Sequence, residues 1–301
     1  MICKKTILIT GSGGFLGRHL LKALENLPGY HVIAASSTPK KIYGDVDRIS
    51  NAHLLSSDFS FKEIDLLLHC AFPRQNNAQF AEGLRFSSSV LGKAAMEGVG
   101  ALVYISSQSV YTRKRTASAS EDTPILLDDV YAAAKYSTEL LIQQLYRNIP
   151  YTCIRLASLI GPEFEPRVTN QLVRKALEEQ TLTVLDAPIR YGLLDIDDAV
   201  RGISLLLRSE PTSWEPVYNL AGVGSWTLSE LAQMIQGFLH DQGIPITVQS
   251  LPSDRYENTA LNGLRFEQDF GFHPQISMQQ SIQRIVAYQL REGNANGDRR
   301  K

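Results

Sequence analysis

A tyrosine and a lysine four residues apart could carry proton-transfer chemistry. Tyr131 and Lys135 lie in a stretch, residues 130–146, whose apolar spacing predicts a helix, so both side chains occupy one helix face. A free tyrosine has a pKa near 10, and its phenolate must be stabilised by about 4 kcal/mol to bring that value to about 7. A neighbouring ammonium supplies part of this stabilisation. The pair alone is also typical of an ordinary surface helix.

Ser107 makes the catalytic interpretation the stronger one. It directly follows a predicted buried strand at residues 101–106. In a doubly wound parallel sheet, the carboxyl ends of the strands line the ligand crevice. A serine hydroxyl at that edge can hold a substrate oxygen while Tyr131 moves the proton. Ser107, Tyr131 and Lys135 are therefore the candidate catalytic residues.

A glycine-rich loop near the amino terminus is typical of a dinucleotide site. It reads Thr10-Gly11-Ser12-Gly13-Gly14-Phe15-Leu16-Gly17 and joins an apolar strand to an amphipathic helix. Glycines at positions 11, 14 and 17 permit a tight turn, close approach of a diphosphate, and close packing of helix on strand. The helix amino terminus offers unpaired N–H groups to the phosphates. The loop therefore predicts cofactor binding.

Strand-like and helix-like segments alternate through the first half of the chain. This alternation predicts a Rossmann-type, doubly wound α/β fold, in which helices cover both faces of a parallel sheet. The predicted strands are residues 6–10, 31–35, 65–71, 101–106 and 151–157. The predicted helices are one from the glycine loop to about residue 28, then 86–97 and 130–146.

The alternation loosens after Gly161-Pro162, and a domain change is expected there. Residues 1–162 form the predicted NAD(P)-binding domain, with residues about 190–222 as a candidate to return to it. Residues 163–292 form a smaller α/β substrate domain, with helices expected at 168–179, 198–207, 228–239 and 278–290. The polar residues 293–301 are expected to be a disordered tail.

The composition gives information about the binding partners and the cellular compartment of the protein. Thirty Lys+Arg residues balance 31 Asp+Glu residues to a net charge of −1, which gives no reason to expect nucleic acid or an anionic membrane. No apolar run approaches the roughly 20 residues that span a bilayer. The three cysteines are odd in number and widely spaced, so we expect no disulfide or metal framework and a reducing, cytoplasmic compartment.

Further motifs follow the glycine loop in a fixed order along the chain. They are Asp58, His69-Cys70-Ala71-Phe72, Ser106-Ser107-Gln108-Ser109-Val110-Tyr111, Tyr131 with Lys135, Arg155 with Gly161-Pro162, Arg190 with Asp195-Ile196-Asp197-Asp198, and Tyr218-Asn219-Leu220. This ordered set resembles the extended short-chain dehydrogenase/reductases of the NAD(P)-dependent epimerase/dehydratase family, and the resemblance covers nearly the whole chain.

The resemblance implies a site, a substrate class and an assembly. It implies a nucleotide-linked sugar as substrate, with Arg190 at the diphosphate, and a homodimer. Asp58 is implied to lie near the adenine, and no metal is implied. The expected cofactor-binding residues are Gly11, Gly14, Phe15, Leu16, Gly17, Ser36, Asp58, Ala71, Tyr131 and Lys135, and the expected substrate-binding residues are Ser107, Ser158 and Arg190.

Departures from the family pattern narrow the reaction. Gln108 and Ser109 stand where family dehydratases carry Asp-Glu, which argues against sugar 4,6-dehydration. The leading hypothesis is an oxidoreductase that reduces a keto group of a nucleotide-linked sugar. One alternative is an epimerase on the same substrates with retained NAD. Two more remain open: a reductase of a non-nucleotide carbonyl compound, and a non-catalytic NAD(P)-binding sensor.

The second predicted strand bears on cofactor choice. NAD-preferring members place a carboxylate at its carboxyl end, where it accepts hydrogen bonds from the adenine ribose. Here Ser36 occupies that position, and Lys40 and Lys41 follow in the next loop. We therefore expect a modest preference for NADP, with NAD still usable.

Overall fold

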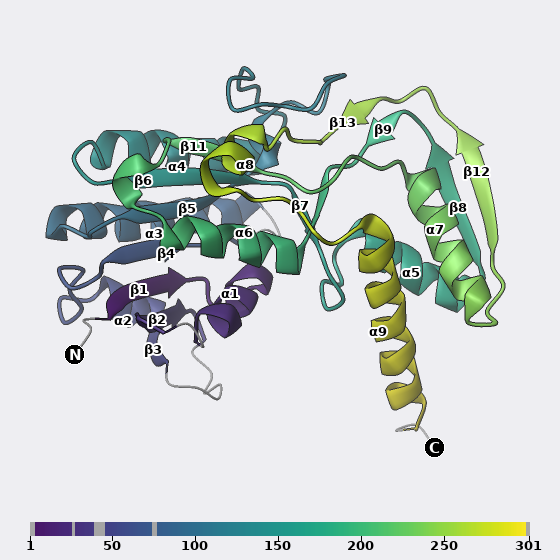
Figure 1. The fold of residues 1–301 in the computed structure, drawn as a ribbon, viewed down its shortest axis with the longest axis horizontal. Helices are drawn as coiled ribbons and strands as arrows, with labels where there is room; N and C mark the ends of the chain where they lie inside the picture. Colours follow the sequence, from purple (N-terminus) through teal and green to yellow (C-terminus); the bar gives the residue numbers. More distant parts are fainter. Residues whose placement is uncertain (1–3, 26–27, 39–45, 74–76, 299–301) are drawn as a thin grey trace.

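The computed structural model describes residues 4–25, 28–38, 46–73 and 77–298. Within them, seven strands form one wholly parallel sheet in the order β11-β6-β5-β4-β1-β2-β3 (Figure 1). The strands are β1 (Lys5–Thr10), β2 (Tyr30–Ser36), β3 (Asp47–Ser50), β4 (Leu66–His69), β5 (Leu102–Ser107), β6 (Tyr151–Leu156) and β11 (Val217–Leu220). The chain runs outward from β1 in both directions, as a doubly wound sheet requires.

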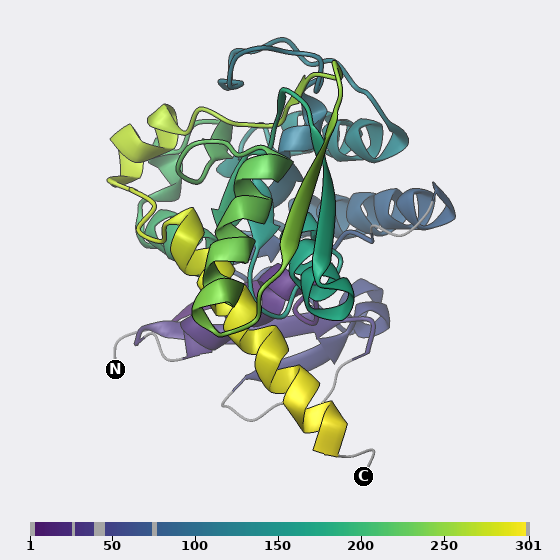
Figure 2. The ribbon, with the colours of Figure 1, turned by 90° about the vertical axis from the view of Figure 1, so that its right-hand side faces the viewer.

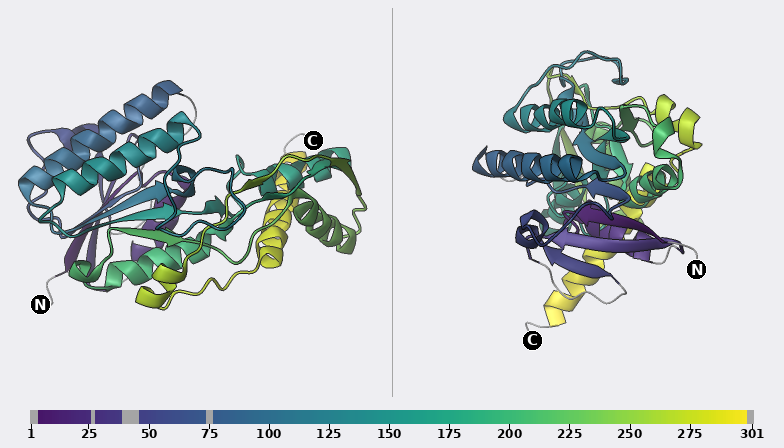
Figure 3. Two further views of the ribbon diagram at one scale, coloured as in Figure 1. Left: turned by 90° about the horizontal axis from the view of Figure 1, so that it is seen from above. Right: turned by 90° about the vertical axis from the view of Figure 1, so that its left-hand side faces the viewer.

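Helices cover both faces of this sheet. Figure 3 shows α3 (Asn77–Glu97) and α4 (Val130–Leu145) on one face and α6 (Ile196–Arg208) on the other, where α1 (Phe15–Glu25) also packs. Alternation along β1 explains the two layers, because Ile7 and Ile9 join the core beneath α1 and α6 while Leu8 joins the core beneath α3 and α4. The predicted Rossmann-type fold is confirmed.

The carboxyl-terminal part has a core of its own. A parallel pair, β8 (Thr181–Asp186) and β12 (Thr247–Pro252), packs with α5 (Val168–Glu179), α7 (Leu228–Asp241) and α9 (Met278–Asp298) (Figure 2). Two shorter parallel pairs are β7 (Ser158–Ile160) with β10 (Leu193–Asp195), and β9 (Ile189–Arg190) with β13 (Glu257–Asn258). This smaller α/β unit agrees with the expected fold class.

Several elements differ from the sequence prediction. Helix α3 begins at Asn77, nine residues before the predicted start, and α9 continues to Asp298 where a disordered tail was expected. Residues 299–301 lie outside the described residues. The sequence pattern does not predict β3, β7, β12, β13, α2 (Asn51–Leu55) or α8 (Leu264–Phe270). In the described part of the chain, no helix has the length and apolar character needed to cross a membrane.

Part of the segment at 190–222 does lie on the central sheet, because β11 pairs with β6 and α6 packs against α1. The division of the chain into two domains near residue 162 stays a prediction.

Candidate active site

The glycine loop is tight enough to require glycine at two positions. Gly11 has a φ of +68°, and a Cβ there would lie 2.7 Å from the backbone of Ala71. A Cβ on Gly17 would lie 2.2 Å from the carbonyl oxygen of Gly11. These close approaches let the end of β1, the start of α1 and the segment after β4 pack backbone against backbone. The result is a compact cradle of the kind that admits a diphosphate at a helix amino terminus.

One cleft of about 720 Å³ opens at the carboxyl ends of β1, β4, β5 and β6. That volume is in the range of small-molecule and cofactor sites. The lining includes Gly11, Gly14, Phe15, Leu16 and Gly17 from the loop, Ser107, Tyr131 and Lys135 from the candidate catalytic set, and Ser158. The structure thus brings most of the predicted site residues to one cavity.

The candidate catalytic side chains are held by different elements. Lys135 of α4 is buried, and its Nζ donates to the carbonyl oxygen of Ile105 at 2.7 Å. Tyr131, one turn earlier, packs against the rings of Phe72 and Phe80 with centroids 5.8 Å and 5.6 Å away. Ser107 ends β5, and its Oγ accepts the backbone N–H of Ser109 at 3.1 Å. The Ser107 hydroxyl proton is therefore available to a ligand oxygen.

Neutral groups surround Lys135. Burial and the nearby Lys135 ammonium lower the pKa of His69 to about 3, so the imidazole is neutral at ordinary pH. His69 bridges Thr10 Oγ1 at 2.8 Å and Ser87 Oγ at 2.9 Å, so it ties β1, β4 and α3 together. Burial also raises the pKa of the Cys70 thiol to about 12. These contacts give His69 a structural role.

Some predicted residues lie near the cleft or away from it. Ala71 contacts the loop at Gly11, and Ser36 lies close to Gly13. Asp58 is exposed after α2 and is not part of the cleft lining. Arg190 is also outside the lining.

Arg190 is bound elsewhere in the carboxyl-terminal part. Its Nη1 lies 3.1 Å from a carboxylate oxygen of Glu230 and donates to the carbonyl oxygen of Ser225 at 3.2 Å. The implied contact of Arg190 with a substrate diphosphate would therefore require a rearrangement of these bonds.

The structure adds cleft residues that the sequence does not predict. Phe164 and Arg167, in the loop between β7 and α5, line the cleft, and the Arg167 guanidinium carbon lies 4.8 Å from the Phe164 ring centroid. Phe164 stacks on Phe15 of the glycine loop. No periodicity or spacing marks these loop residues, so only the fold could identify them. Within the described residues, no group of three or more His, Cys, Asp or Glu side chains is arranged to hold a metal.

Comparison with known families agrees with this geometry. Residues 7–221 match the family described as "NAD dependent epimerase/dehydratase family". The chain belongs to this family. The match runs from β1 to the end of β11, so it includes the glycine loop, the Ser107 strand and the α4 helix. The resemblance predicted from the sequence motifs is confirmed.

Members of the epimerase/dehydratase family with different reactions resemble the chain. A dTDP-4-dehydro-6-deoxy-D-allose reductase from Streptomyces bikiniensis is 28% identical over 78% of this chain and 81% of its own length. A mouse dTDP-D-glucose 4,6-dehydratase is 22% identical over 94% of this chain and 88% of its own. Because dehydratases are among the relatives, the comparisons do not support the expectation against sugar 4,6-dehydration.

Solved structures of the epimerase/dehydratase family share the fold. The UDP-glucuronic acid 4-epimerase from Bacillus cereus, in complex with UDP-glucuronic acid and NAD, superposes with a TM-score of 0.81. It is 21% identical, and the match covers 95% of this chain and 99% of that structure.

Proposed function

We propose that this protein reduces a keto group of a nucleotide-linked sugar, with a nicotinamide cofactor as the hydride donor and Tyr131 as the acid. The observation that carries the proposal is the convergence of Ser107, Tyr131 and Lys135 with the glycine loop in one cleft. A pure sensor of the cofactor would have no need of the three polar side chains. The names of the relatives support the substrate class.

The residues of the cleft fit a dinucleotide, because the glycine loop lines it at the start of α1, and a Cβ on Gly11 or Gly17 would clash with backbone and disrupt that loop. When bound, the nicotinamide ring supplies the hydride that reduces the carbonyl carbon. Ser107 Oγ donates a hydrogen bond to the carbonyl oxygen and fixes its direction. Tyr131 transfers its phenolic proton to that oxygen as the carbon accepts the hydride. The Lys135 ammonium stabilises the phenolate that remains.

The charges of the cleft support reduction over dehydration. Its described lining contains two cations, Lys135 and Arg167, and no carboxylate. Removal of a sugar hydroxyl as water calls for an acid and a base, and here Gln108 and Ser109 are buried neutral groups. Arg167 offers a guanidinium suited to a diphosphate. The contact of Arg190 with substrate, the NADP preference and the homodimer stay predictions.

An epimerase with a retained cofactor is the second candidate. The observation that favours it is the contact of the 161–167 loop with α1, through the Phe15–Phe164 stack and an Arg18–Glu163 ion pair at 2.7 Å. Both contacts close the chain over the helix end where the cofactor phosphates would bind. A cofactor held in this way could serve many turnovers of transient oxidation and reduction.

A binding screen followed by product analysis tests both candidates. We expect UDP, dTDP, GDP or CDP to raise thermal stability in the presence of cofactor, since a ligand at a hundredfold excess over its Kd adds about 2.7 kcal/mol. Keto sugars of the best-binding nucleotide are then incubated with NADPH. Stoichiometric oxidation of NADPH supports the reductase, and interconversion of sugar epimers without net oxidation supports the epimerase. Formation of an unsaturated or deoxy-keto sugar from a hydroxyl substrate would contradict both.

A further inference from the structure

A buried ion pair lies behind the candidate catalytic residues. Glu139 of α4 and Arg155 of β6 each have side chains only 6% exposed. Arg155 Nη2 lies 2.7 Å from one carboxylate oxygen of Glu139, and Arg155 Nε lies 3.2 Å from both. Such a two-pronged contact adds a defined orientation of the two side chains to the attraction between their charges.

Glu139 also attaches the catalytic helix to β5, the strand that carries Ser107. On β5, the carbonyl oxygen of Ile105 accepts from Lys135 Nζ, and the next residue, Ser106, donates its hydroxyl to Glu139. Consecutive residues of the strand therefore hold side chains one turn apart on α4. Since Ser107 is the following strand residue, these contacts set where α4 presents Tyr131 relative to Ser107.

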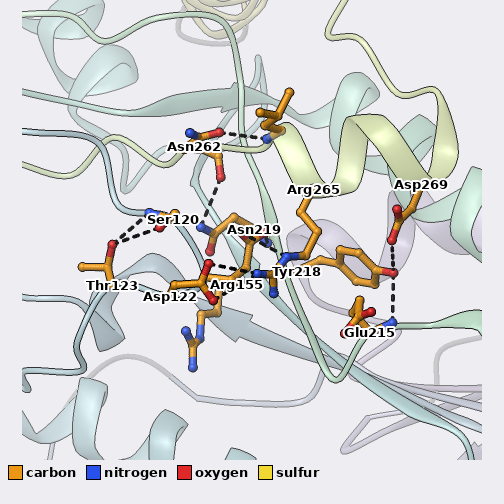
Figure 4. A network of polar contacts seen from close by, with 12 residues as sticks. Ser120, Asp122, Thr123, Arg155, Glu215, Tyr218, Asn219, Asn262, Arg265 and Asp269 are labelled. Carbon is orange, nitrogen blue, oxygen red and sulfur yellow. Dashed lines mark hydrogen bonds and ion pairs between the residues drawn. The ribbon is translucent and has the colours of Figure 1, made fainter.

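Hydrogen bonds also connect Arg155 to Tyr111, which follows β5, and through Tyr111 to Asn219 on β11. Arg155 Nη1 donates to Tyr111 Oη at 2.7 Å, and Tyr111 Oη donates to Asn219 Oδ1 at 3.0 Å. Figure 4 shows Arg155 and Asn219 together, where Asn219 Nδ2 also donates to the carbonyl oxygen of Asn262 at 3.2 Å. The Arg155 guanidinium is therefore held by Glu139 on one side and by Tyr111 on the other.

Arg167 is the second cation of the cleft lining, and several other titratable groups near Tyr131 and Lys135 are neutral at ordinary pH. Burial lowers the pKa of His69 on β4, and burial raises the pKa values of Cys70, Tyr104 on β5 and Cys153 on β6. At the exposed start of α4, Asp129 pairs with Arg113 at 2.9 Å. Among the described residues, Glu139 and Arg155 are the charged pair buried behind the site.

We propose that Glu139 and Arg155 are positioning residues that hold α4 in register with β5 and cancel one another's charge, so that Lys135 sets the electrostatic environment of Tyr131. This inference rests on the proposed function, in which Tyr131 is the acid. Loss of one partner leaves the charge of the other behind the site. A residual carboxylate disfavours a phenolate nearby, and a residual guanidinium favours it.

The test is an ultraviolet difference titration of the phenolate in cofactor-bound enzyme, with Tyr131→Phe as the baseline. We expect Arg155→Gln to move the Tyr131 midpoint to higher pH and Glu139→Gln to lower pH, each by about half a unit or more. The double variant Glu139→Gln/Arg155→Gln should return to the wild-type midpoint. Coincident midpoints in all four proteins, or shifts of the same sign, would overturn the proposal.

Where a single variant fails to fold, Arg155→Lys is tested instead. Lysine keeps the positive charge but cannot make the two-pronged hydrogen bonds to Glu139. We expect an unchanged midpoint, an unchanged cofactor Kd and a kcat lowered about tenfold or more through misalignment. An unchanged kcat or a moved midpoint would count against positioning. The titration needs no substrate, so it is decided separately from the proposed reaction.

Discussion

The ring of Phe15 stacks on the ring of Phe164, with centroids 4.1 Å apart and planes 7° from parallel. Phe15 is the first residue of α1, and Phe164 belongs to the loop that precedes α5. The loop that leads into the carboxyl-terminal part therefore rests on the helix end that would bind the cofactor phosphates. Aromatic stacking of this kind contributes about 0.5–1.5 kcal/mol beyond the area it buries.

Phe164→Ala is expected to speed release of the cofactor. Losing the stack should raise the dissociation rate up to about tenfold, since 1.4 kcal/mol is a factor of ten. Stopped-flow fluorescence of the reduced cofactor measures that rate. Glu163→Gln is the matched comparison and should change the rate less than Phe164→Ala, because the Arg18–Glu163 pair is exposed and an exposed pair contributes only about 0–1 kcal/mol. Equal rates for Phe164→Ala and wild type would show that the loop does not retain the cofactor.

Only one of two glycines in the same loop should be sensitive to replacement by alanine. Gly17→Ala places its Cβ 2.2 Å from the Gly11 carbonyl oxygen, so the backbone must move and cofactor affinity should fall by at least about tenfold. Gly13→Ala meets nothing closer than Ser36 Cβ at 3.9 Å and should bind within about twofold of wild type. Calorimetric titration with the cofactor measures the Kd of each variant and of the wild type. Similar losses in both variants would contradict a cradle whose tight contact lies at Gly17.

His69 should make the fold sensitive to acid. Its pKa is lowered to about 3 in the folded protein and is near 6.5 when unfolded, so the unfolded chain alone binds a proton between those values. Stability is therefore full above about pH 6.5 and falls as pH decreases, by about 2 kcal/mol at pH 5. Denaturant unfolding should show a smaller loss over this range for His69→Gln. The exposed His240→Gln is the control, and an equal loss in all three proteins would contradict the assignment.

Cofactor choice should depend on Ser36. We expect NADP to bind more tightly than NAD by less than about tenfold, because an ion pair at the protein surface contributes only about 0–1 kcal/mol. Lys40 and Lys41, which would neutralise the 2′-phosphate, lie outside the described residues. Ser36→Asp should reverse the preference, since a carboxylate repels that phosphate and accepts from the ribose hydroxyls. Ser37→Asp is the control. Tighter NAD binding by the wild type, at matched ionic strength, would contradict the expectation.

Most of the central sheet, though not its edge strand β3, and the ligand edge could be predicted because local sequence patterns specify them. Each predicted strand is a short apolar run that forms a strand in the structure. The glycine loop and the Tyr131–Lys135 spacing are also local patterns, and they form the predicted turn and helix. Helix α3 shows where local patterns fail. Its first half contains Gly83, which disfavours a helix, yet a Cβ there would lie 2.6 Å from Pro73, so close packing requires glycine.

The remainder of the site depends on contacts between distant segments. Phe164 and Arg167 carry no periodic signal, and they reach the cleft only because β7 and α5 direct their loop towards α1. Arg190 matches a family motif, but its bonds to Glu230 and Ser225 are decided by the folding of the carboxyl-terminal part. A motif specifies the residue type, and the tertiary fold specifies where the side chain lies.

The most direct test of the account is the rate of keto-sugar reduction by Tyr131→Phe. This change removes only the phenolic oxygen and keeps the ring that packs against Phe72 and Phe80. Proton transfer by a positioned side chain contributes about 10²–10⁴-fold, so kcat should fall by that factor while the cofactor Kd stays within about twofold of wild type. A variant that keeps more than about a tenth of the wild-type rate would contradict the role of Tyr131 as the acid.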